Sequence, residues 1–438
     1  MKKLLLFSFL IVKMVGFSQQ TTLKVVGKNL TLTNGQTIIL RGVNYPFIDD
    51  GNLDMTNPIS YQSRIDEAAK TGANAIRIMW YTNGTHWRDS AQFGTPGTMN
   101  GYVNNGHLNN VVAYCITKNM IPILEIHNLT CTNDWATFNT TVMNFWKSAI
   151  IQTLIENNKS KLIINLANEF GIVRWGANPA NDLLIFKNNY NAAIASLRAL
   201  NINVPIMIDA PDCGQSSTEM LSVAESMNSS DSQGNLIFSA HTYWGGYATT
   251  LPQIQAKLNE AQNTNVCYIL GEVAKNQDNN SCGDLDLSAI YPLILQEACP
   301  RNIGWLAWSF SQDCSPARNM TPNGLYANLT TFGNDIVNNT TYGLKSAGTC
   351  RAASLATNKF EIDKTAIAIF PNPSSGQFAL RTSNSVIKVS CTDILGKQVN
   401  LQDFGSNSYQ INETSKGIFI LKIEFENGNL VYKKLILD

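Results

Sequence analysis

The chain is poor in charged residues, which make up 15% of its 438 residues. The 32 Lys and Arg side chains balance the 32 Asp and Glu side chains, so the formal net charge is zero. Nucleic acids and anionic membranes attract basic surfaces, and this composition offers no such attraction. We therefore expect no nucleic-acid partner, whereas an uncharged polar polymer is compatible with the composition.

The chain also lacks a CxxC pair, and no cysteine lies near a histidine at the spacing of zinc ligands. We therefore expect no zinc site, and no motif indicates another metal or a cofactor. The nine cysteines are an odd number, so at least one thiol stays free even if disulfides form.

Long apolar runs are missing as well, and no later segment reaches the length of a membrane span. Residues 1–18 have the features of a secretory signal peptide. Lys2 and Lys3 precede the mostly apolar run Leu4–Val12, and the small residues Gly16 and Ser18 follow. We expect the chain to be exported, and an exported chain can form disulfides.

Short strands are expected at 23–26, 30–32 and 37–40, and the turn Asn34-Gly35 joins the last two. After them, apolar runs alternate with segments of helical periodicity within the predicted domain, residues 19–345. Segments 60–71, 142–157 and 184–200 are examples of the helical periodicity. The apolar runs number eight, and eight strands that alternate with helices predict a closed (β/α)8 barrel. A doubly wound open sheet is the alternative, but no Gly-rich phosphate-binding turn follows the first run, where Arg41–Asn44 stands instead. The eight runs end at Asn44, Trp80, His127, Glu169, Asp209, His241, Glu272 and Trp308.

The pattern changes after residue 345. Residues 346–364 are rich in small residues and are predicted to form a linker. Residues 365–438 contain short alternating strands separated by turns, which predicts a small β-sandwich. We find no cluster of acids or histidines in this segment and assign it no chemistry.

Two of the buried runs end in glutamate: Leu162–Phe170 (LIINLANEF) contains Glu169, and Val266–Glu272 (VCYILGE) ends at Glu272. The carboxyl ends of barrel strands meet at one mouth, where active sites of this fold lie. A structural ion pair could explain one such charge, but polar or aromatic endings on eight strands indicate a common site. Two carboxyl groups with different tasks can hydrolyse a glycosidic bond, and retention of configuration needs them about 5–5.5 Å apart.

The motifs resemble glycoside hydrolase family 5 across nearly all of residues 38–310. The resemblance implies a retaining endo-acting glycanase with Glu169 as acid/base and Glu272 as nucleophile. It further implies that Arg77 and Tyr243 hold Glu272 by hydrogen bonds, and that Asn168 binds the sugar 2-hydroxyl. His127 and His241 would line the reactive subsite, and Trp308 would form its stacking floor; a purely structural role for each polar side chain is the alternative. The motifs are Arg41–Asn44 (RGVN), Gly72–Arg77 (GANAIR), Ile126–His127 (IH), Ala167–Glu169 (ANE), His241–Tyr243 (HTY), Leu270–Glu272 (LGE) and Leu306–Ser309 (LAWS).

Within that family, the segments 123–127, 163–169, 206–210, 238–241 and 304–309 look most like bacterial β-1,4-mannanases. The chain departs from their pattern at Asn128, where they usually carry Asp, and at Cys213, near which they have a Trp. The favoured activity is therefore endo-β-1,4-mannanase, with endo-β-1,4-glucanase as the alternative and a non-catalytic glycan-binding barrel as a remote one.

Other residues in the loops after the strands suggest further features. Cys282 and Cys314 follow the seventh and eighth strands, which are neighbours in a barrel, so we expect a disulfide between them. Five tryptophans lie in or just after strand ends, where each could stack on a sugar or pack in a loop. They are Trp80, Trp87, Trp135, Trp175 and Trp244.

The C-terminal segment resembles the type A sorting domain of the type IX secretion system over about residues 365–438. The motifs are Phe370–Gly376 (FPNPSSG), Asp393–Lys397 (DILGK), Gly417–Lys422 (GIFILK) and the closing Lys433–Leu437 (KKLIL). The resemblance implies that the secretion machinery is a partner, that the domain is removed after export, and that the protein is secreted or held at the cell surface. We expect the protein to be a monomer.

Overall fold

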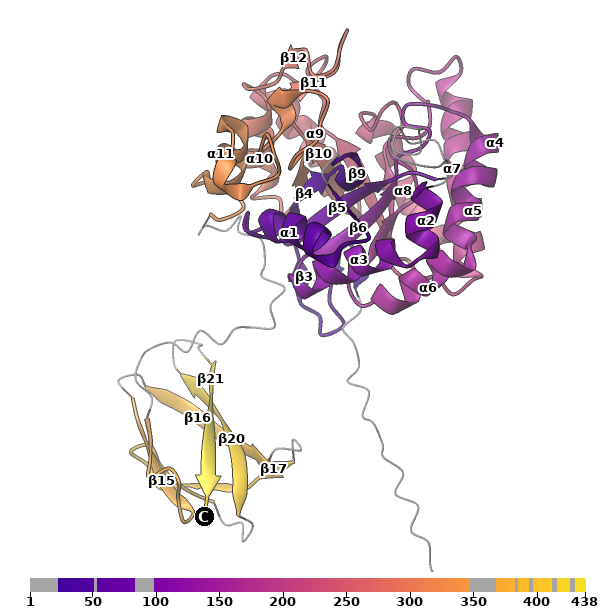
Figure 1. Ribbon diagram of the computed structural model, residues 1–438. Helices are drawn as coiled ribbons and strands as arrows, with labels where there is room; N and C mark the ends of the chain where they lie inside the picture. Colours follow the sequence, from indigo (N-terminus) through magenta and orange to yellow (C-terminus); the bar gives the residue numbers. More distant parts are fainter. Residues whose placement is uncertain are drawn as a thin grey trace, which may run out of the picture. The chain divides into compact units, whose positions relative to one another are not determined.

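The computed structural model describes residues 23–50, 53–82, 98–346, 368–382, 385–393, 397–411, 416–425 and 430–438 (Figure 1). The predicted signal peptide, most of the predicted linker and Trp87 lie outside the described residues. The chain divides into two compact units, Met1–Leu355 and Ala356–Asp438, and each is described by itself.

The first unit is built on a closed barrel of parallel strands, which confirms the predicted (β/α)8 fold and excludes the open sheet. Nearly every residue of these strands is buried, which explains why they appear in the sequence as continuous apolar runs. The strands are β4 (Arg41–Tyr45), β5 (Ala75–Trp80), β6 (Ile121–Ile126), β7 (Ile163–Asn165), β8 (Ile206–Asp209), β9 (Leu236–His241), β10 (Cys267–Val273) and β13 (Gly304–Ala307).

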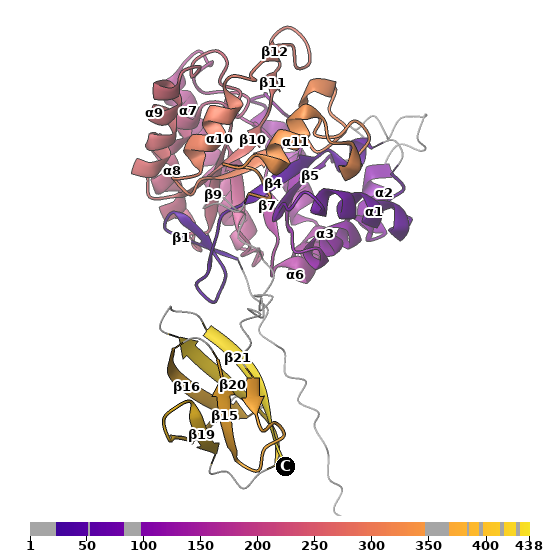
Figure 2. The ribbon, with the colours of Figure 1, turned by 90° about the vertical axis from the view of Figure 1, so that its left-hand side faces the viewer.

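Helices surround the barrel, as Figures 1 and 2 show from two sides. The α-helices are α1 (Pro58–Ala69), α2 (Thr98–Asn104), α3 (His107–Thr117), α4 (Trp135–Thr137), α5 (Met143–Lys147), α6 (Ala149–Asn158), α7 (Pro179–Arg198), α8 (Ser217–Ser230), α9 (Leu251–Asn263), α10 (Tyr291–Ala298) and α11 (Thr331–Asn338). Short helical turns are η1 (Phe47–Asp49), η3 (Phe138–Val142), η4 (Pro316–Arg318) and η5 (Tyr326–Asn328).

Local sequence signals fix several helix starts. Asn57 caps α1 and Pro58 occupies its first turn, while Thr250 and Gln253 form a capping box at α9. The expectation of one helix over residues 142–157 is wrong, because Ser148 is extended and separates α5 from α6. The Ser148 hydroxyl accepts a hydrogen bond from the Ile151 N–H, so this residue starts a new helix instead of continuing the old one.

A small antiparallel sheet closes the amino-terminal end of the barrel. Its strands are β1 (Lys24–Val26), β2 (Asn29–Thr31) and β3 (Thr37–Ile38). Val25 and Leu30 of this sheet belong to the same buried cluster as Ala75, Ile121 and Ile163, which are the first residues of three barrel strands. In both views this sheet lies at the opposite end of the barrel from β11 (Asn276–Gln277) and β12 (Leu285–Asp286). This small sheet therefore leaves the carboxyl end of the barrel uncovered.

The second unit consists of two four-stranded antiparallel sheets, in agreement with the predicted small β-sandwich. Both sheets contribute side chains to one core, which includes Phe378, Tyr409, Cys391 and Leu421. The strands are β14 (Ala368–Phe370), β15 (Gln377–Arg381), β16 (Val386–Asp393), β17 (Gln398–Val399), β18 (Leu401–Asp403), β19 (Ser408–Ile411), β20 (Gly417–Phe425) and β21 (Leu430–Leu437). None of the helices in the described part of the chain has the length and apolarity to cross a membrane.

Candidate active site

The carboxyl ends of the barrel strands surround a cleft of about 670 Å³. Six of the eight residues predicted for the site line it, and the other two, Arg77 and His241, are buried. The six lining residues are His127, Asn168, Glu169, Tyr243, Glu272 and Trp308. Residues from six different strands or the loops after them thus come together as the fold predicts.

Glu272, near the end of β10, is held by two donors. The Arg77 Nη1 group donates to Glu272 Oε1 at 2.9 Å, and the Tyr243 hydroxyl donates to Oε2 at 2.7 Å. Both oxygens of a buried carboxylate therefore have a hydrogen-bond donor. Such bonds favour the ionised form of a carboxyl group and fix its orientation.

Arg77 is the centre of this network. Besides Glu272, its guanidinium donates to Asn165 Oδ1, Asn168 Oδ1 and Asp209 Oδ2 at 2.9, 2.7 and 3.1 Å. Burial opposes the charge on Arg77, but the nearby carboxylates, Glu125 foremost, outweigh burial and raise its pKa. The guanidinium thus remains charged beneath the cleft and holds groups from three other strands, β7, β8 and β10, or from their ends.

Glu169 follows β7 in a strained conformation, with a φ of +49°. Its N–H donates to Asp209 Oδ2 at 3.2 Å, and its carbonyl accepts from the Cys131 N–H at 3.2 Å. A glutamate adopts the left-handed conformation less readily than a glycine does, so these two hydrogen bonds hold the Glu169 backbone in that conformation. Burial raises the pKa of the Glu169 carboxyl, the bond to His241 opposes that rise, and the charge of Glu272 reinforces it.

His241 contacts both carboxyl groups. Its Nδ1 lies 2.6 Å from Glu169 Oε1 and 3.4 Å from Glu272 Oε1. Burial lowers its pKa, but Glu272, Asp209 and Glu169 outweigh that effect and raise the pKa to about 9. Space for the ring depends on Gly214, which has a φ of +74° and where a Cβ would lie within 2.6 Å of the imidazole. The imidazole is therefore fixed between two carboxyl groups.

The separation of the two glutamates bears directly on chemistry. One carboxylate oxygen of Glu169 and one of Glu272 lie within 4.8 Å of each other. Retaining glycosidases have their two carboxyl groups about 5–5.5 Å apart, whereas inverting ones have about 6.5–9.5 Å to accommodate a water. The carboxyl groups of Glu169 and Glu272 have the closer of these two spacings.

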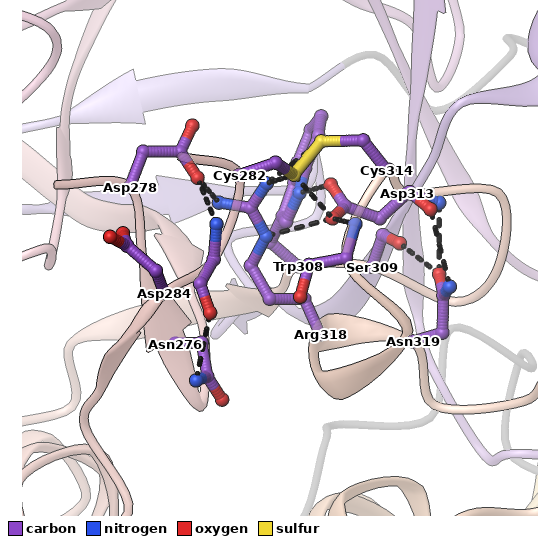
Figure 3. The surroundings of a disulfide bond; sticks show 12 residues. Asn276, Asp278, Cys282, Asp284, Trp308, Ser309, Asp313, Cys314, Arg318 and Asn319 are labelled. Atoms are coloured by element: carbon purple, nitrogen blue, oxygen red, sulfur yellow. Dashed lines mark hydrogen bonds and ion pairs between the residues drawn. A yellow bond between two sulfur atoms is a disulfide. The ribbon is translucent and has the colours of Figure 1, made fainter. Parts of the chain in front are cut away.

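Trp308 and His127 form a second wall of the cleft. Their rings are stacked, with centroids 6.1 Å apart and an angle of 14° between the planes. The Trp308 Nε1 group donates to Asp313 Oδ2 at 2.6 Å, and Asp313 in turn pairs with Arg318 at 2.8 Å (Figure 3). His127 Nδ1 lies 3.3 Å from Glu125 Oε2. Both rings are therefore fixed by charged groups.

The predicted disulfide between Cys282 and Cys314 is present beside this wall (Figure 3). The Arg318 Nη2 group contacts both sulfur atoms, at 3.1 Å for Cys282 and 3.5 Å for Cys314. The bond joins the loops after β10 and β13, which are paired strands. A second disulfide, Cys131–Cys213, was not predicted.

The tryptophans at strand ends have different roles. Trp80 and Trp244 are fully buried, so the idea that they stack on sugars is wrong and they belong to the core. Trp135 packs against Phe138 and Phe170, with centroids 5.3 and 4.6 Å away. Trp175 lines the cleft and is 51% exposed, so its ring surface is accessible there.

Sequence reasoning missed several residues that support the site: Glu125, Thr130, Asn165, Asp313 and Arg318. Glu125 and Asn165 were detectable, because each interrupts a buried apolar strand with a polar side chain. Thr130, whose hydroxyl accepts from Asn168 Nδ2 at 3.1 Å, lies in a loop with no such signal. Asp313 and Arg318 likewise lie in a polar loop, where charges are ordinary.

Comparison with known proteins identifies the family. Residues 32–313 match the family model described as "Cellulase (glycosyl hydrolase family 5)". The chain belongs to glycosyl hydrolase family 5. By this membership it is a glycoside hydrolase. Residues 368–438 match the secretion system C-terminal sorting domain, which confirms the second predicted resemblance.

Relatives within family 5 include a mannan endo-1,4-beta-mannosidase from Streptomyces lividans, 28% identical over 74% of this chain and 74% of that protein. Another protein of that name, from Cellvibrio japonicus, is 28% identical over 72% of this chain and 66% of its own length. Among solved structures, the catalytic domain of a mannanase from Streptomyces sp. SirexAA-E has a TM-score of 0.59 at 24% identity, with 79% of this chain and 98% of that one covered. This structural likeness supports the barrel fold.

Proposed function

We propose that this family 5 enzyme cleaves β-1,4-linked mannan or glucomannan internally and retains the anomeric configuration. The observation that carries the proposal is the pair of carboxyl groups within 4.8 Å of each other, each with different partners. Glu272 has two donors, Arg77 and Tyr243, that stabilise its charge. Glu169 has a raised pKa, first because of its burial, and so keeps a proton more readily.

The first step assigned to this pair is displacement of the leaving sugar. Ionised Glu272 attacks the anomeric carbon and forms a glycosyl ester, while the glycosidic C–O bond breaks. Protonated Glu169 gives its proton to the departing oxygen, so the leaving sugar departs as a neutral alcohol. In the second step Glu169, now ionised, takes a proton from water, and the water oxygen displaces Glu272 from the anomeric carbon.

The other predicted residues fit supporting roles in these steps. Asn168 is beside Glu169, and its amide is oriented by Arg77 at Oδ1 and Thr130 at Nδ2, so we assign it the sugar 2-hydroxyl. His241 would position Glu169, and His127 and Trp308 would border the reactive sugar. These roles rest on the contacts above and on the family resemblance.

Mannan is favoured as substrate because two relatives are named mannan endo-1,4-beta-mannosidases. Endo-β-1,4-glucanase remains the second candidate, since the matching family model bears the name cellulase. We further propose domain limits of 19–345, 346–364 and 365–438, a signal peptide at 1–18 and a monomeric enzyme. The sorting domain supports export to the medium or cell surface through the secretion machinery.

Three experiments test this function. A reducing-sugar assay on mannan, glucomannan and carboxymethylcellulose in parallel should give hydrolysis of the first two; activity confined to the cellulose derivative would contradict the mannan assignment. Proton NMR of the first products should show the β-anomer before mutarotation. Glu272→Gln should lower the rate by several orders of magnitude, because no other group can take the nucleophile's place; an undiminished rate would refute the mechanism.

A further inference from the structure

Glu125, on β6, is a buried carboxyl group that the steps proposed above do not use. Alternate residues of a barrel strand point to the inside of the barrel, so Ile121, Ile123 and Glu125 share one face of β6. Ile121 and Ile123 belong to the same buried cluster as Ile163 and Met207 of the next two strands. Glu125 continues this inward row at the carboxyl end of the strand. A carboxyl group is costly to bury there, so its partners indicate what it does.

One oxygen of this carboxyl group makes its polar contacts. Glu125 Oε2 lies 3.3 Å from His127 Nδ1 and 3.8 Å from Arg77 Nη1. Glu125 Oε1 is buried and has no hydrogen-bond partner in the described part of the chain. An unpaired buried oxygen weakens a folded protein, so this side chain is poorly explained by a contribution to stability.

Arg77 does not need Glu125 to stay charged or in place. Glu125 raises the pKa of Arg77 more than the other carboxylates do, but an arginine is protonated with or without such a neighbour. The guanidinium also keeps its hydrogen bonds to Glu272 and Asp209, at 2.9 and 3.1 Å. The group whose state depends on Glu125 is therefore His127.

The His127 side chain has Glu125 as its one hydrogen-bond partner among the described residues. Burial lowers the pKa of His127, but the charge of Glu125 and the hydrogen bond to it outweigh that effect. Glu272 also raises this pKa, and Arg77 lowers it by a smaller amount. The net result is a raised pKa, so the imidazole holds its proton more readily than a histidine in water.

The remaining neighbours of the ring do not decide its charge. Trp308 is stacked on it and carries no titratable group. The Tyr81 ring meets it edge-on at 5.6 Å, and burial raises the pKa of the Tyr81 hydroxyl, which stays neutral where histidines titrate. Burial raises the pKa of Glu169, and the charge of His127 is a smaller effect in the opposite direction. Glu125 is therefore the main source of the charge on His127.

We infer that Glu125 is a positioning residue that acts through His127: it holds the imidazole as a cation, with one proton on Nδ1 toward Glu125 and one on Nε2 for a sugar hydroxyl. His127 lines the cleft, and a charged N–H donor binds a hydroxyl oxygen more strongly than a neutral one. The inference rests on the proposed function for the contact between His127 and the sugar, whereas the charge of the ring can be measured without substrate.

The first test is NMR of the full-length protein labelled with 15N-histidine. The chain has four histidines, so its imidazole signals are few, and His127→Asn identifies those of His127. In the wild type, His127 should titrate at a higher pH than a histidine in water, with both nitrogens protonated below that midpoint. Glu125→Gln keeps the size of the side chain and removes its charge, so the midpoint should move to lower pH. Glu125→Asp keeps the charge and should recover part of the shift.

The second test is the pH dependence of KM on glucomannan. In Glu125→Gln, KM should rise about five- to tenfold at a pH where the variant's His127 has lost its proton, with a smaller change in kcat. At a lower pH His127 is protonated in both proteins, and the two KM values should converge. A carboxyl group with only a structural role would not make the difference in KM depend on pH.

Asp231→Asn is the matched control, because Asp231 is also a buried acid, pairs with Arg198 at 2.8 Å and does not line the cleft. It should leave the His127 midpoint and KM unchanged. A wild-type His127 that titrates at or below the usual pKa of histidine would overturn the inference, as would a midpoint that Glu125→Gln leaves in place or a KM difference equal at every pH. These results leave the proposed function standing. A wild type without activity on mannan, glucomannan and carboxymethylcellulose would overturn the proposed function, and the contact of His127 with a sugar with it.

Discussion

The buried guanidinium of Arg77 allows a quantitative test of what holds the barrel mouth together. The proposed change is Arg77→Met, which keeps much of the side chain's length and removes its charge. The substitution removes the guanidinium that lies 3.1 Å from Asp209, 2.9 Å from Glu272 and 3.8 Å from Glu125. All three carboxylates are buried.

Removing one partner of a buried ion pair costs about 3–5 kcal/mol, because an uncompensated charge remains. Since each kcal/mol shifts the midpoint of a large domain by about 2 °C, we expect Tm to fall by about 6–10 °C. Scanning calorimetry of the full-length protein measures the barrel transition. Arg301→Met is the control: Arg301 pairs with Glu297 at 2.7 Å at the partly exposed surface, and such pairs contribute less than about 1 kcal/mol.

The pH dependence of this loss distinguishes charge from packing. In the variant, burial disfavours the charged form of the carboxyl groups that have lost the guanidinium, so the folded state of the variant binds protons more readily than that of the wild type. Stability of the variant relative to wild type should therefore recover as pH falls from 7 to 5. A Tm loss no larger than that of Arg301→Met, or a loss equal at both pH values, would refute the reasoning.

Three further predictions concern the contacts of the site. Tyr243→Phe removes the 2.7 Å bond to Glu272, and since a bond to a charged group contributes about 1.5–3 kcal/mol, kcat should fall about 10- to 150-fold; a fall under threefold in initial-rate assays would contradict this role. His241→Gln removes a group that lowers the pKa of Glu169, so the alkaline limb of the kcat/KM profile should move to higher pH. The control His107→Gln, on α3, should leave that limb in place. An unmoved limb in His241→Gln would show that His241 does not influence the pKa of the acid. Asp313→Ala removes the acceptor 2.6 Å from the Trp308 indole, so KM on glucomannan should rise about five- to tenfold with a smaller change in kcat. Asp286→Ala, on β12, is the control. Equal KM values for the two variants would show that Asp313 does not position the Trp308 ring.

The eight strands and their polar ends could be predicted from the sequence for a physical reason. Parallel barrel strands are buried on both faces, so each is a continuous apolar run, and a polar residue at its end is conspicuous. The bond from Arg77 to Glu272 was expected only from the family resemblance, and the approach of Arg77 to Asn165, Asn168 and Asp209 could not be predicted, because it depends on the barrel's closure and on side-chain reach across it. No spacing along the chain encodes those distances.

The disulfides Cys282–Cys314 and Cys131–Cys213 illustrate the same limit. Cys282 and Cys314 follow β10 and β13, which pair directly, so their proximity followed from the strand order. Cys131 and Cys213 follow β6 and β8, which are separated by β7, so their loops must fold over an intervening strand end to meet. The break at Ser148 was missed because the apolar periodicity continues across it, while the capping preference of one serine is a weak local signal.

The left-handed backbone of Glu169 places strain at the residue to which we assign the acid role. A glycine at this φ of +49° would relieve strain of about 1 kcal/mol or more, and it would also remove a carboxyl group buried beside Glu272. It would also remove the 2.6 Å contact between Glu169 and His241, and the loss of that contact opposes the gain from relieved strain. The carboxyl group that the proposed acid step needs therefore stands on a backbone that a glycine would adopt with less strain.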